Sequence, residues 1–397
     1  MIRVLLIPSS DYLGHPFPQR HNHLFERLHD EKEFEVHVIR FNIFKKARLK
    51  TKCIIHEIPF EIKIQSTAAY YLANIPLYIN EIMKIIRNEA IDIVVAGNLL
   101  PPFLYCLLEK LTEKKIPFIF DLQDYYPISA AGYILSTKSS LSTIIRGLFE
   151  IITQTLIKKA NAVTVPGIAL AMYAKEVGAK HVHLIPNGIS EHFLKQHDGT
   201  KIRNKLGYKE NDIVVGYVGS VEFWLDMEPL IKAIAKANKQ GVPVKLLLIG
   251  KHLQTGYARK VKKWIEKHGI AELTTWLSFI PHEKVPEYIA AMDIGTIPFD
   301  VNNLTAYYAA PNKMWEYLSQ GKIVASTPIP ESIANKDKLF LVRNEDDYCS
   351  LFKTYMENPL NSIKIFLKRC QNLKSRCWTS SVHKLKQILY KAASKRK

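Results

Sequence analysis

The sequence predicts an α/β fold made of two Rossmann-like domains in tandem. Short apolar runs alternate with helical patterns through the first half of the chain, and the same alternation starts again in the second half. Strands that alternate with helices form parallel sheets covered by helices on both faces. A chain of 397 residues is long enough for two domains of ordinary size.

The first half begins with an apolar run that is too short for a signal peptide and is expected to be a buried strand. The expected strands are 3–8, 35–40, 54–59, 91–96, 117–121, 162–166 and 182–185. The expected helices are 19–29, 69–87, 103–114, 142–159 and 168–177. The first domain should end near Asn187-Gly188, because that dipeptide is a turn signal.

The second half repeats the pattern after a polar stretch that ends near residue 212. Its expected strands are 213–219, 244–250, 275–279, 294–298, 322–326 and 340–342.

Composition excludes several classes of protein. Hydrophobic residues at 47% and charged residues at 23% are typical of a globular chain. Five cysteines without a C-x-x-C pair argue against a disulfide framework or a zinc site and suit a reducing compartment. No apolar run is long enough for a membrane-spanning helix. The nearest candidate, residues 93–108, contains Asn98, Pro101 and Pro102 and is expected to be strand, loop and helix.

The charge is strongly basic, since 55 basic minus 37 acidic residues give +18. Residues 40–52 and 361–397 contain no acidic residue. Phe41, Ile43 and Phe44 lie within the first of these segments and favour an anionic membrane surface as its partner. The alternative is a lysine-rich loop and a solvated tail. No nucleic-acid-binding signature is found, so nucleic acid is not an expected partner.

The most informative stretch is 311–325. Pro311 fits the first position of a helix and Gly321 its C-terminal stop. The free N–H groups and positive dipole end of the helix favour an anion, and Lys313 adds a full charge there. Glu316 lies three residues on, near the same face. This helix end can therefore offer a cation to phosphate and a carboxylate to sugar hydroxyls; the alternative is a surface helix with a Lys–Glu pair.

This stretch resembles the donor-binding segment of retaining family 4 glycosyltransferases of the GT-B fold, Pro-x-Lys-x-x-Glu-Tyr-Leu-x-x-Gly-Lys-x-Val. The resemblance implies that Glu316 binds the ribose of a nucleotide-sugar and Lys313 its diphosphate, with Pro311 and Asn312 at the donor. Many members carry a second glutamate eight positions before the first, where this chain has Tyr308. The chain therefore resembles a subgroup that lacks it.

Two more segments resemble that family: Ile-Pro-Asn-Gly at 185–188, as at its interdomain hinge, and Trp378 at the start of a last helix. The resemblance implies two domains that face each other across a cleft. Residues 1–188, joined by the helix 378–397, would bind the acceptor, and residues 189–377 would bind the nucleotide-sugar.

The loop after the first strand is not G-x-G-x-x-G, so a nicotinamide cofactor is not expected. Ligands of parallel α/β sheets bind beyond the carboxyl ends of the strands, where this loop lies. The resemblance makes Gly14 a candidate for the donor; the alternative is a plain turn glycine. Asp11, His15 and Arg20 are candidates for the acceptor.

The loop after the strand 117–121 resembles the family segment that places a His-Asp or Arg-Asp pair beside the transferred sugar. Gln123 stands where many members have histidine, and Asp124 is retained. We therefore expect Asp124 to be catalytic and Gln123 to face the acceptor. The alternative is that Asp121 and Asp124 cap the strand end and a turn.

Two loops of the second half complete the expected donor site. The first lacks the usual Arg and Lys of the family and resembles a subgroup with Gly-x-x-x-x-Trp-x-Asp, here Gly219, Trp224 and Asp226. Ser220 belongs to the same loop, and Trp224 could equally be a core residue. The second loop contains His282 and would lie by the nucleotide base.

The sequence thus predicts a glycosyltransferase that moves a sugar from a nucleotide diphosphate donor to an acceptor hydroxyl, with Asp124 and Lys313 as catalytic residues. The resemblance implies retention of configuration. No metal or cofactor is expected, because the histidines lack metal-ligand spacing and a lysine and a helix dipole take the metal's place. The expected acceptor is a glycan or lipid-linked glycan, and the expected location is the cytoplasmic face of a membrane. The alternatives are a nucleotide-sugar epimerase of the same fold and a non-catalytic sugar-binding or scaffold protein.

Overall fold

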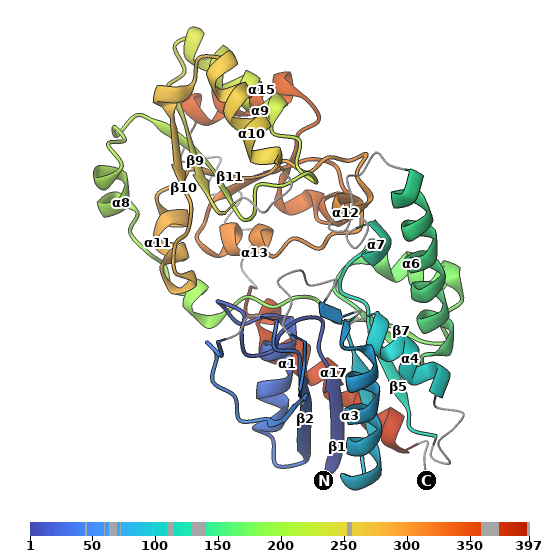
Figure 1. Cartoon of the computed structure of the whole chain (residues 1–397). Helices are drawn as coiled ribbons and strands as arrows, with labels where there is room; N and C mark the ends of the chain where they lie inside the picture. The colour runs from blue at the N-terminus through green and yellow to red at the C-terminus, as the bar shows by residue number, and fades with distance from the viewer. Residues whose placement is uncertain are drawn as a thin grey trace. The chain divides into compact units, whose positions relative to one another are not determined.

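The computed structural model divides into two compact units: unit 1 is Met1–Asn187 with Trp378–Lys397, and unit 2 is Gly188–Cys377 (Figure 1). Each unit contains one parallel sheet with helices on its faces, so the predicted tandem of Rossmann-like domains is confirmed. The structure describes residues 1–43, 46–58, 60–62, 70–71, 73–97, 99–108, 115–128, 140–251, 256–358 and 373–394.

The sheet of unit 1 has the strand order β3-β2-β1-β4-β5-β6-β7. Its strands are β1 (Ile2–Ile7), β2 (Phe34–Arg40), β3 (Ile54–Glu57), β4 (Ile93–Ala96), β5 (Phe118–Asp121), β6 (Ala162–Val165) and β7 (Val182–Leu184). All pairs are parallel; Val4 of β1, for example, faces Val36 on one side and Ile93 on the other. The central strand β4 is apolar and buried throughout, because helices cover both faces of the sheet.

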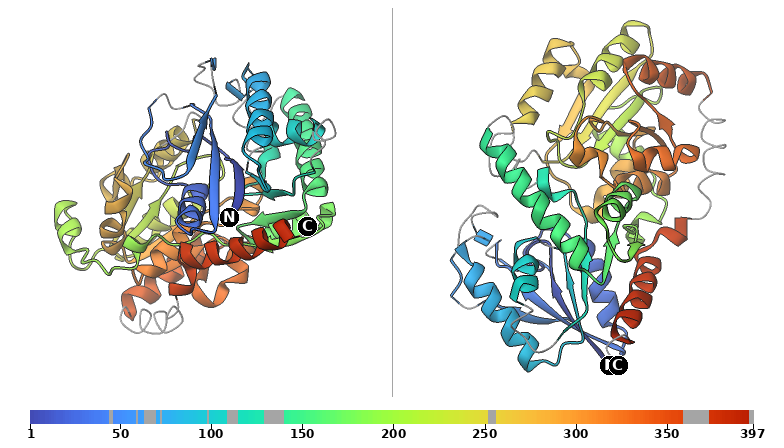
Figure 2. Two further views of the ribbon diagram at one scale, coloured as in Figure 1. Left: turned by 90° about the horizontal axis from the view of Figure 1, so that it is seen from below. Right: turned by 90° about the vertical axis from the view of Figure 1, so that its right-hand side faces the viewer.

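The helices of unit 1 are α1 (Arg20–His29), α3 (Ile75–Asn88), α4 (Leu100–Leu108), α6 (Ser140–Lys159), α7 (Ile168–Val177) and α17 (Trp378–Ser394). The last of these packs against α1, and Figure 2 shows the red C-terminal helix beside the blue N-terminal elements. Trp378 stacks on His23 with 4.6 Å between the ring centroids. The predicted return of the last helix to the first domain is therefore confirmed.

The sheet of unit 2 has the order β10-β9-β8-β11-β12-β13. Its strands are β8 (Ile213–Val218), β9 (Val244–Ile249), β10 (Thr274–Leu277), β11 (Ile294–Ile297), β12 (Ile323–Ser326) and β13 (Phe340–Leu341). Its helices are α8 (Thr200–Lys205), α9 (Glu228–Lys239), α10 (Tyr257–Lys267), α11 (Val285–Ala290), α12 (Leu304–Tyr307), α13 (Asn312–Ser319), α14 (Pro330–Ala334) and α15 (Glu345–Glu357).

The strand order reverses at the first strand of each sheet. β1 lies between β2 and β4, and β8 lies between β9 and β11. At such a strand, the loops that follow it and its neighbour run to opposite faces of the sheet. The crevice between these loops, beyond the carboxyl end of the strand, is the usual ligand site of the doubly wound fold. The loops after β1, β5 and β8 and the start of α13 are thus the parts of the fold on which a site depends.

The helix predicted from Pro311 begins one residue later. Pro311 has extended backbone angles of φ −71° and ψ 115° and is the N-cap of α13. After Gln320, Gly321 has φ +67°, the left-handed conformation expected of the residue that ends a helix.

Phe41 corrects one expectation. Its side chain is fully buried, with the rings of Tyr71 and Tyr78 at 5.2 Å each, so the prediction that Phe41 can enter lipid is wrong. Ile43 is half-buried, and Phe44 lies outside the described residues. Among the residues that the structure describes, no helix is both long and apolar enough to cross a membrane. The run predicted as strand, loop and helix forms β4 and α4.

Candidate active site

The amine of Lys313 lies against the glycine that follows β8 in unit 2. A Cβ added at Gly219 would lie 3.2 Å from Cε and 3.3 Å from Nζ of Lys313. Gly219 also has φ +139°, a conformation that side chains rarely adopt. At the end of β9, a Cβ added at Gly250 would lie only 1.9 Å from the carbonyl oxygen of Gly219. The glycine at 219 therefore allows its backbone to approach Lys313 closely, and the glycine at 250 makes room for the carbonyl of Gly219.

Two aromatic rings support the same amine. Nζ of Lys313 lies 5.0 Å from the ring centroid of Tyr217 on β8 and 5.0 Å from that of Phe299, which follows β11. A cation over an aromatic face is attracted by the ring quadrupole. The hydroxyl of Tyr217 also donates to the carbonyl of Ser220 at 2.9 Å and so positions the loop after β8.

The start of α13 has no side-chain cap, because the N-cap residue is Pro311. In the same unit, the side chain of Asn344 accepts from the first N–H groups of α15 at 3.0 Å. The first N–H groups of an uncapped helix carry partial positive charge and favour an anion. Asn312 and Lys313 provide the first turn at this end.

Glu316 lies one turn further along α13, and neither its carboxylate nor the Lys313 amine forms an ion pair with another described residue. Burial raises the pKa of Glu316 to about 7, although the charge of Lys313 opposes this shift. Burial lowers the pKa of Lys313 to about 8, against the charge of Glu316. The hydroxyl of Tyr317 accepts from the Val218 N–H at 2.8 Å and fixes the helix on β8. Desolvated charges without a close partner are typical of functional sites.

Other predicted donor residues have different neighbours. Asp226 lies before α9, where desolvation and the carboxylates of Asp300 and Glu228 raise its pKa. Trp224 packs on the core of unit 2, as in the alternative interpretation of that residue.

His282 begins the 3-10 turn η4 (His282–Lys284) and contacts the rings of His192 and Phe193 at 4.9 Å and 5.3 Å. Burial and the neighbouring His192 lower the pKa of His282. The structure thus gathers Gly219, Ser220, Pro311, Asn312, Lys313 and Glu316, and gives Asp226 and His282 other contacts.

In unit 1, the carboxylate of Asp121 at the end of β5 is the centre of a buried polar cluster. Nε of Arg20, Nε2 of His21 and Nε2 of Gln123 each lie 3.0 Å from its Oδ2, and the Thr164 hydroxyl donates to Oδ1 at 2.6 Å. Burial opposes ionisation, yet Arg20 and His21 hold the pKa of Asp121 well below its usual range. Asp121 is thus more than a cap of the strand.

The guanidinium of Arg20 is committed to the fold. Besides Asp121, it donates to the carbonyl of Ile185 at 2.8 Å and to the side chain of Asn187 at 2.9 Å. With 7% of its surface exposed, Arg20 ties α1 to β5 and to the end of β7. These contacts favour a structural role for Arg20 over the predicted binding of an acceptor anion.

Gln123 is held by Asp121, to whose Oδ2 its amide donates at 3.0 Å. Its Nε2 lies 2.7 Å from Nε2 of His21, and its Oε1 lies 3.4 Å from the Ser9 hydroxyl. The His21 ring fits only because a glycine follows β4, since a Cβ at Gly97 would lie 2.2 Å from that ring. Gln123 itself is half-buried and Asp124 is exposed.

The loop after β1 is organised by Asp11. Its Oδ1 accepts from the N–H groups of Leu13 at 3.1 Å and Gly14 at 2.9 Å, the pattern by which an aspartate stabilises a turn. His15 packs edge-on against Phe17, and burial lowers its pKa. Asp11 is almost fully buried, so its contacts favour a role in shaping the loop that carries Gly14 and His15.

The sequence reasoning missed several residues of these clusters. Metal-ligand spacing gives no role to His21, and the sequence motifs do not include Gly97 or Gly250. A glycine directly after an apolar strand was the available signal, because Gly97, Gly219 and Gly250 all follow strands in this way. Within the described residues, no group of three or more His, Cys, Asp or Glu side chains has a geometry that could hold a metal ion.

Both halves of the chain match models of known families. Residues 19–193 match the model described as glycosyltransferase family 4, and residues 198–359 match that described as glycosyl transferases group 1. No protein of the curated set matches the sequence significantly.

Solved structures share the fold over nearly the whole chain. Sucrose-phosphate synthase from Thermosynechococcus elongatus is 14% identical, with a TM-score of 0.77, and the match covers 98% of this chain and 99% of that one. The HepE protein of Anabaena, solved with UDP and glucose, is 16% identical, with a TM-score of 0.74 over 98% and 100% of the two chains. WaaG, a glycosyltransferase involved in lipopolysaccharide biosynthesis, is 14% identical, with a TM-score of 0.66 over 98% and 99%.

Proposed function

The chain is a glycosyltransferase of the family 4 and group 1 type with the GT-B fold, and we propose that it transfers a sugar from a nucleotide diphosphate donor to an acceptor hydroxyl. The observation that carries the proposal is the junction in unit 2, where the Lys313 amine lies against Gly219 beside the uncapped start of α13. A desolvated cation, an uncapped helix start and a closely approaching backbone suit a diphosphate.

The residues around the contact between Lys313 and Gly219 each bind one part of the nucleotide-sugar. Lys313 and the N–H groups at Asn312 and Lys313 bind the diphosphate, and the backbone of Gly219 and Ser220 approaches it from the other side. Glu316, on the face of α13 that Lys313 shares, binds the ribose hydroxyls. Tyr308 replaces the first glutamate of the paired motif, so the chain belongs to a subgroup that holds the sugar ring differently.

The reaction depends on electrostatic stabilisation. When the glycosidic bond breaks, negative charge develops on the leaving diphosphate, where Lys313 and the helix dipole stabilise it. The leaving phosphate oxygen takes the proton of the acceptor hydroxyl, and the configuration of the sugar is retained. Unit 1 takes the acceptor, with Asp124 as its catalytic residue and with Gln123 positioned by Asp121. Asp124→Asn should lower turnover and leave thermal stability unchanged.

A donor screen tests the proposal. The purified chain is incubated with UDP-, ADP- and GDP-sugars. Proton NMR detects the released sugar and shows which of its two anomers forms first. UDP-sugars come first, because the similar Anabaena structures contain UDP or UDP-glucose. Slow release of the retained anomer from one donor supports the proposal. Formation of a 2-epimer would support an epimerase, and binding without turnover a non-catalytic protein.

We also propose that the acceptor is a glycan or lipid-linked glycan at the cytoplasmic face of a membrane. Support comes from α6, where Ile144, Leu148 and Ile151 are 69%, 55% and 64% exposed. Their spacing of four and three residues places these side chains on one face of the helix. An exposed apolar stripe on a chain of net charge +18 suits an anionic lipid surface.

Vesicle flotation tests this location. The chain should float with vesicles that contain phosphatidylglycerol more than with phosphatidylcholine alone, and added salt should weaken the difference. Leu148→Ser with Ile151→Ser should reduce flotation, whereas Met356→Ser, at a 47% exposed position of unit 2, should not. Equal flotation of all variants, or none by the folded chain, would refute the membrane proposal.

A further inference from the structure

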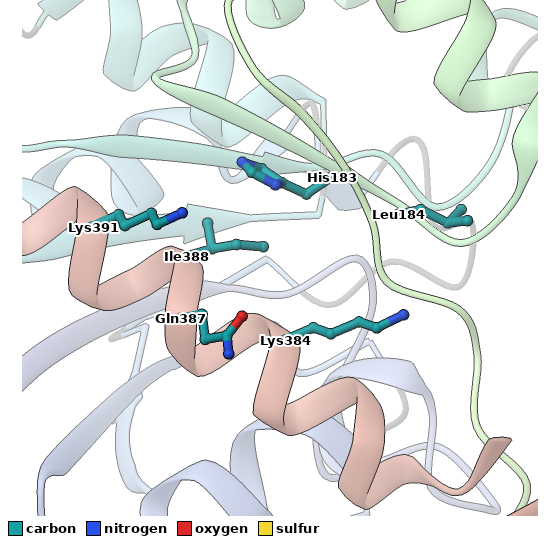
Figure 3. A pocket seen from close by; sticks show the side chains of 6 residues that line it. All are labelled: His183, Leu184, Lys384, Gln387, Ile388 and Lys391. Carbon is teal, nitrogen blue, oxygen red and sulfur yellow. The ribbon is translucent and has the colours of Figure 1, made fainter. Parts of the chain in front are cut away.

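A small pocket lies in unit 1 between the edge strand β7 and the C-terminal helix α17, apart from both clusters described above. Its volume is about 140 Å³. The lining residues are His183, Leu184, Lys384, Gln387, Ile388 and Lys391 (Figure 3). Lys384, Gln387 and Lys391 lie three and four residues apart, so one face of α17 presents them all. This face carries two ammonium groups and an amide toward the strand.

The pocket concentrates positive charge without compensation. None of the lining residues is acidic, and neither lysine forms an ion pair with a carboxylate of any described residue. Burial, His181 and Lys391 lower the pKa of His183. Lys384 and Lys391 carry like charges on one face of the helix, and an anion between them would balance these charges.

Another lysine of the same helix is paired with carboxylates and serves as a comparison. Lys386, on the opposite side of α17, forms ion pairs with Glu31 and with Glu33, the latter at 2.7 Å. These two carboxylates raise the pKa of Lys386, the reverse of the effect at His183. The helix thus has one lysine, Lys386, that is paired with carboxylates, and two, Lys384 and Lys391, that form no ion pair among the described residues.

We propose that this pocket is a binding site for a phosphate group, either of a soluble phosphate ester or of a phospholipid headgroup. Lys384 and Lys391 contact the phosphate oxygens from α17, and His183 and Gln387 donate hydrogen bonds to it. Leu184 and Ile388 form an apolar wall for the group that carries the phosphate. The site is independent of the donor site in unit 2 and of the sugar transfer proposed above.

Isothermal titration with glycerol 3-phosphate tests the site at constant ionic strength. The titration is made with Lys313→Ala, so that the lysine of the donor site does not contribute. The double variant Lys384→Gln/Lys391→Gln on that background should bind at least about tenfold more weakly, since it loses two charged hydrogen-bond donors. A matched control, Lys263→Gln/Lys267→Gln on exposed positions of α10, removes the same charge and should bind normally.

A second arm separates the two sources of phosphate. Flotation with phosphatidylglycerol vesicles is compared for the pocket variant and the α10 control. Loss of flotation in the pocket variant alone, with weak binding of glycerol 3-phosphate, identifies a lipid headgroup; tight pocket-dependent binding of glycerol 3-phosphate identifies a soluble ester. The proposal is overturned if the pocket and control variants are indistinguishable in both arms while their circular dichroism shows folded protein.

Discussion

The polar clusters at the strand ends of the two units differ in how their charges are balanced. In unit 1, Asp121 is surrounded by donors, and Arg20 uses its guanidinium entirely within the fold. In unit 2, Lys313 and Glu316 are desolvated, form no ion pair with a described residue and have pKa values near neutrality. A balanced buried pair resists further ligands, whereas groups that the fold leaves unbalanced are ready to bind one.

This difference separates positioning from binding. The Asp121 cluster fixes where the loops after β1, β4 and β5 lie, and Gln123 and Asp124 depend on that placement. Lys313 and Glu316 form no ion pair with another described residue, so their charges can bind a substrate. Changes in the first cluster should therefore affect stability, and changes in the second should affect catalysis.

The largest effect is expected from Asp121→Asn. This variant leaves the buried Arg20 guanidinium without a countercharge, which costs about 3–5 kcal/mol of unfolding free energy. Chemical denaturation measures the loss, and Asp124→Asn, an exposed aspartate three residues on, should stay within about 0.5 kcal/mol of the parent. If the two variants unfold alike, the Asp121 cluster is not the structural centre of unit 1. Combining Asp121→Asn with Arg20→Met should cost less than the sum of the two single changes.

Lys313→Ala should have the next largest effect, and on the opposite property. Removing one preorganised cation from the developing charge costs about 2–4 kcal/mol of transition-state stabilisation, measured as kcat/KM. Stability should change little, because relief of the desolvation of the amine offsets the loss of its contacts with the rings of Tyr217 and Phe299. Lys267→Ala, at an exposed position of α10, is the control for loss of charge. Normal kcat/KM in Lys313→Ala would disprove its role at the diphosphate.

The architecture could be predicted from the sequence because it depends on local patterns. Alternating apolar runs and helical segments predicted the parallel sheets, whereas the returning helix that begins at Trp378 was expected from the resemblance to GT-B glycosyltransferases. In the site, a helix beginning next to Pro311 and the placement of Lys313 and Glu316 on one side of it followed from spacing alone.

The tertiary contacts could not be predicted in this way. Arg20 and Asp121 lie 101 residues apart, and no local pattern indicates that they form a pair. The burial of Phe41 is a second example: its basic neighbours in the sequence predict exposure, but Tyr71 and Tyr78, 30 or more residues away, pack on its ring.

Glu316→Gln sharpens the assignment within unit 2. The amide keeps the size of the side chain but loses the charge that strengthens hydrogen bonds to the ribose, which should cost about 1.5–3 kcal/mol of donor binding. Isothermal titration with the donor measures this loss, and thermal unfolding should show an intact fold. A donor affinity equal to that of the parent would remove Glu316 from the ribose site.

The pH dependence of kcat/KM tests whether the charges of Lys313 and Glu316 control catalysis. Glu316, with a pKa of about 7, gains its charge as pH rises through that value, and Lys313, with a pKa of about 8, loses its charge as pH rises through that value. If both charges are needed, kcat/KM follows a narrow bell with its maximum between these pKa values and falls about tenfold per pH unit well outside them. Glu316→Gln should remove the acid limb and Lys313→Ala the alkaline limb. Asp121 should contribute to neither limb, because its carboxylate stays ionised far below this range. A profile that is flat from pH 6 to 9 would show that the unbalanced charges of unit 2 do not govern catalysis.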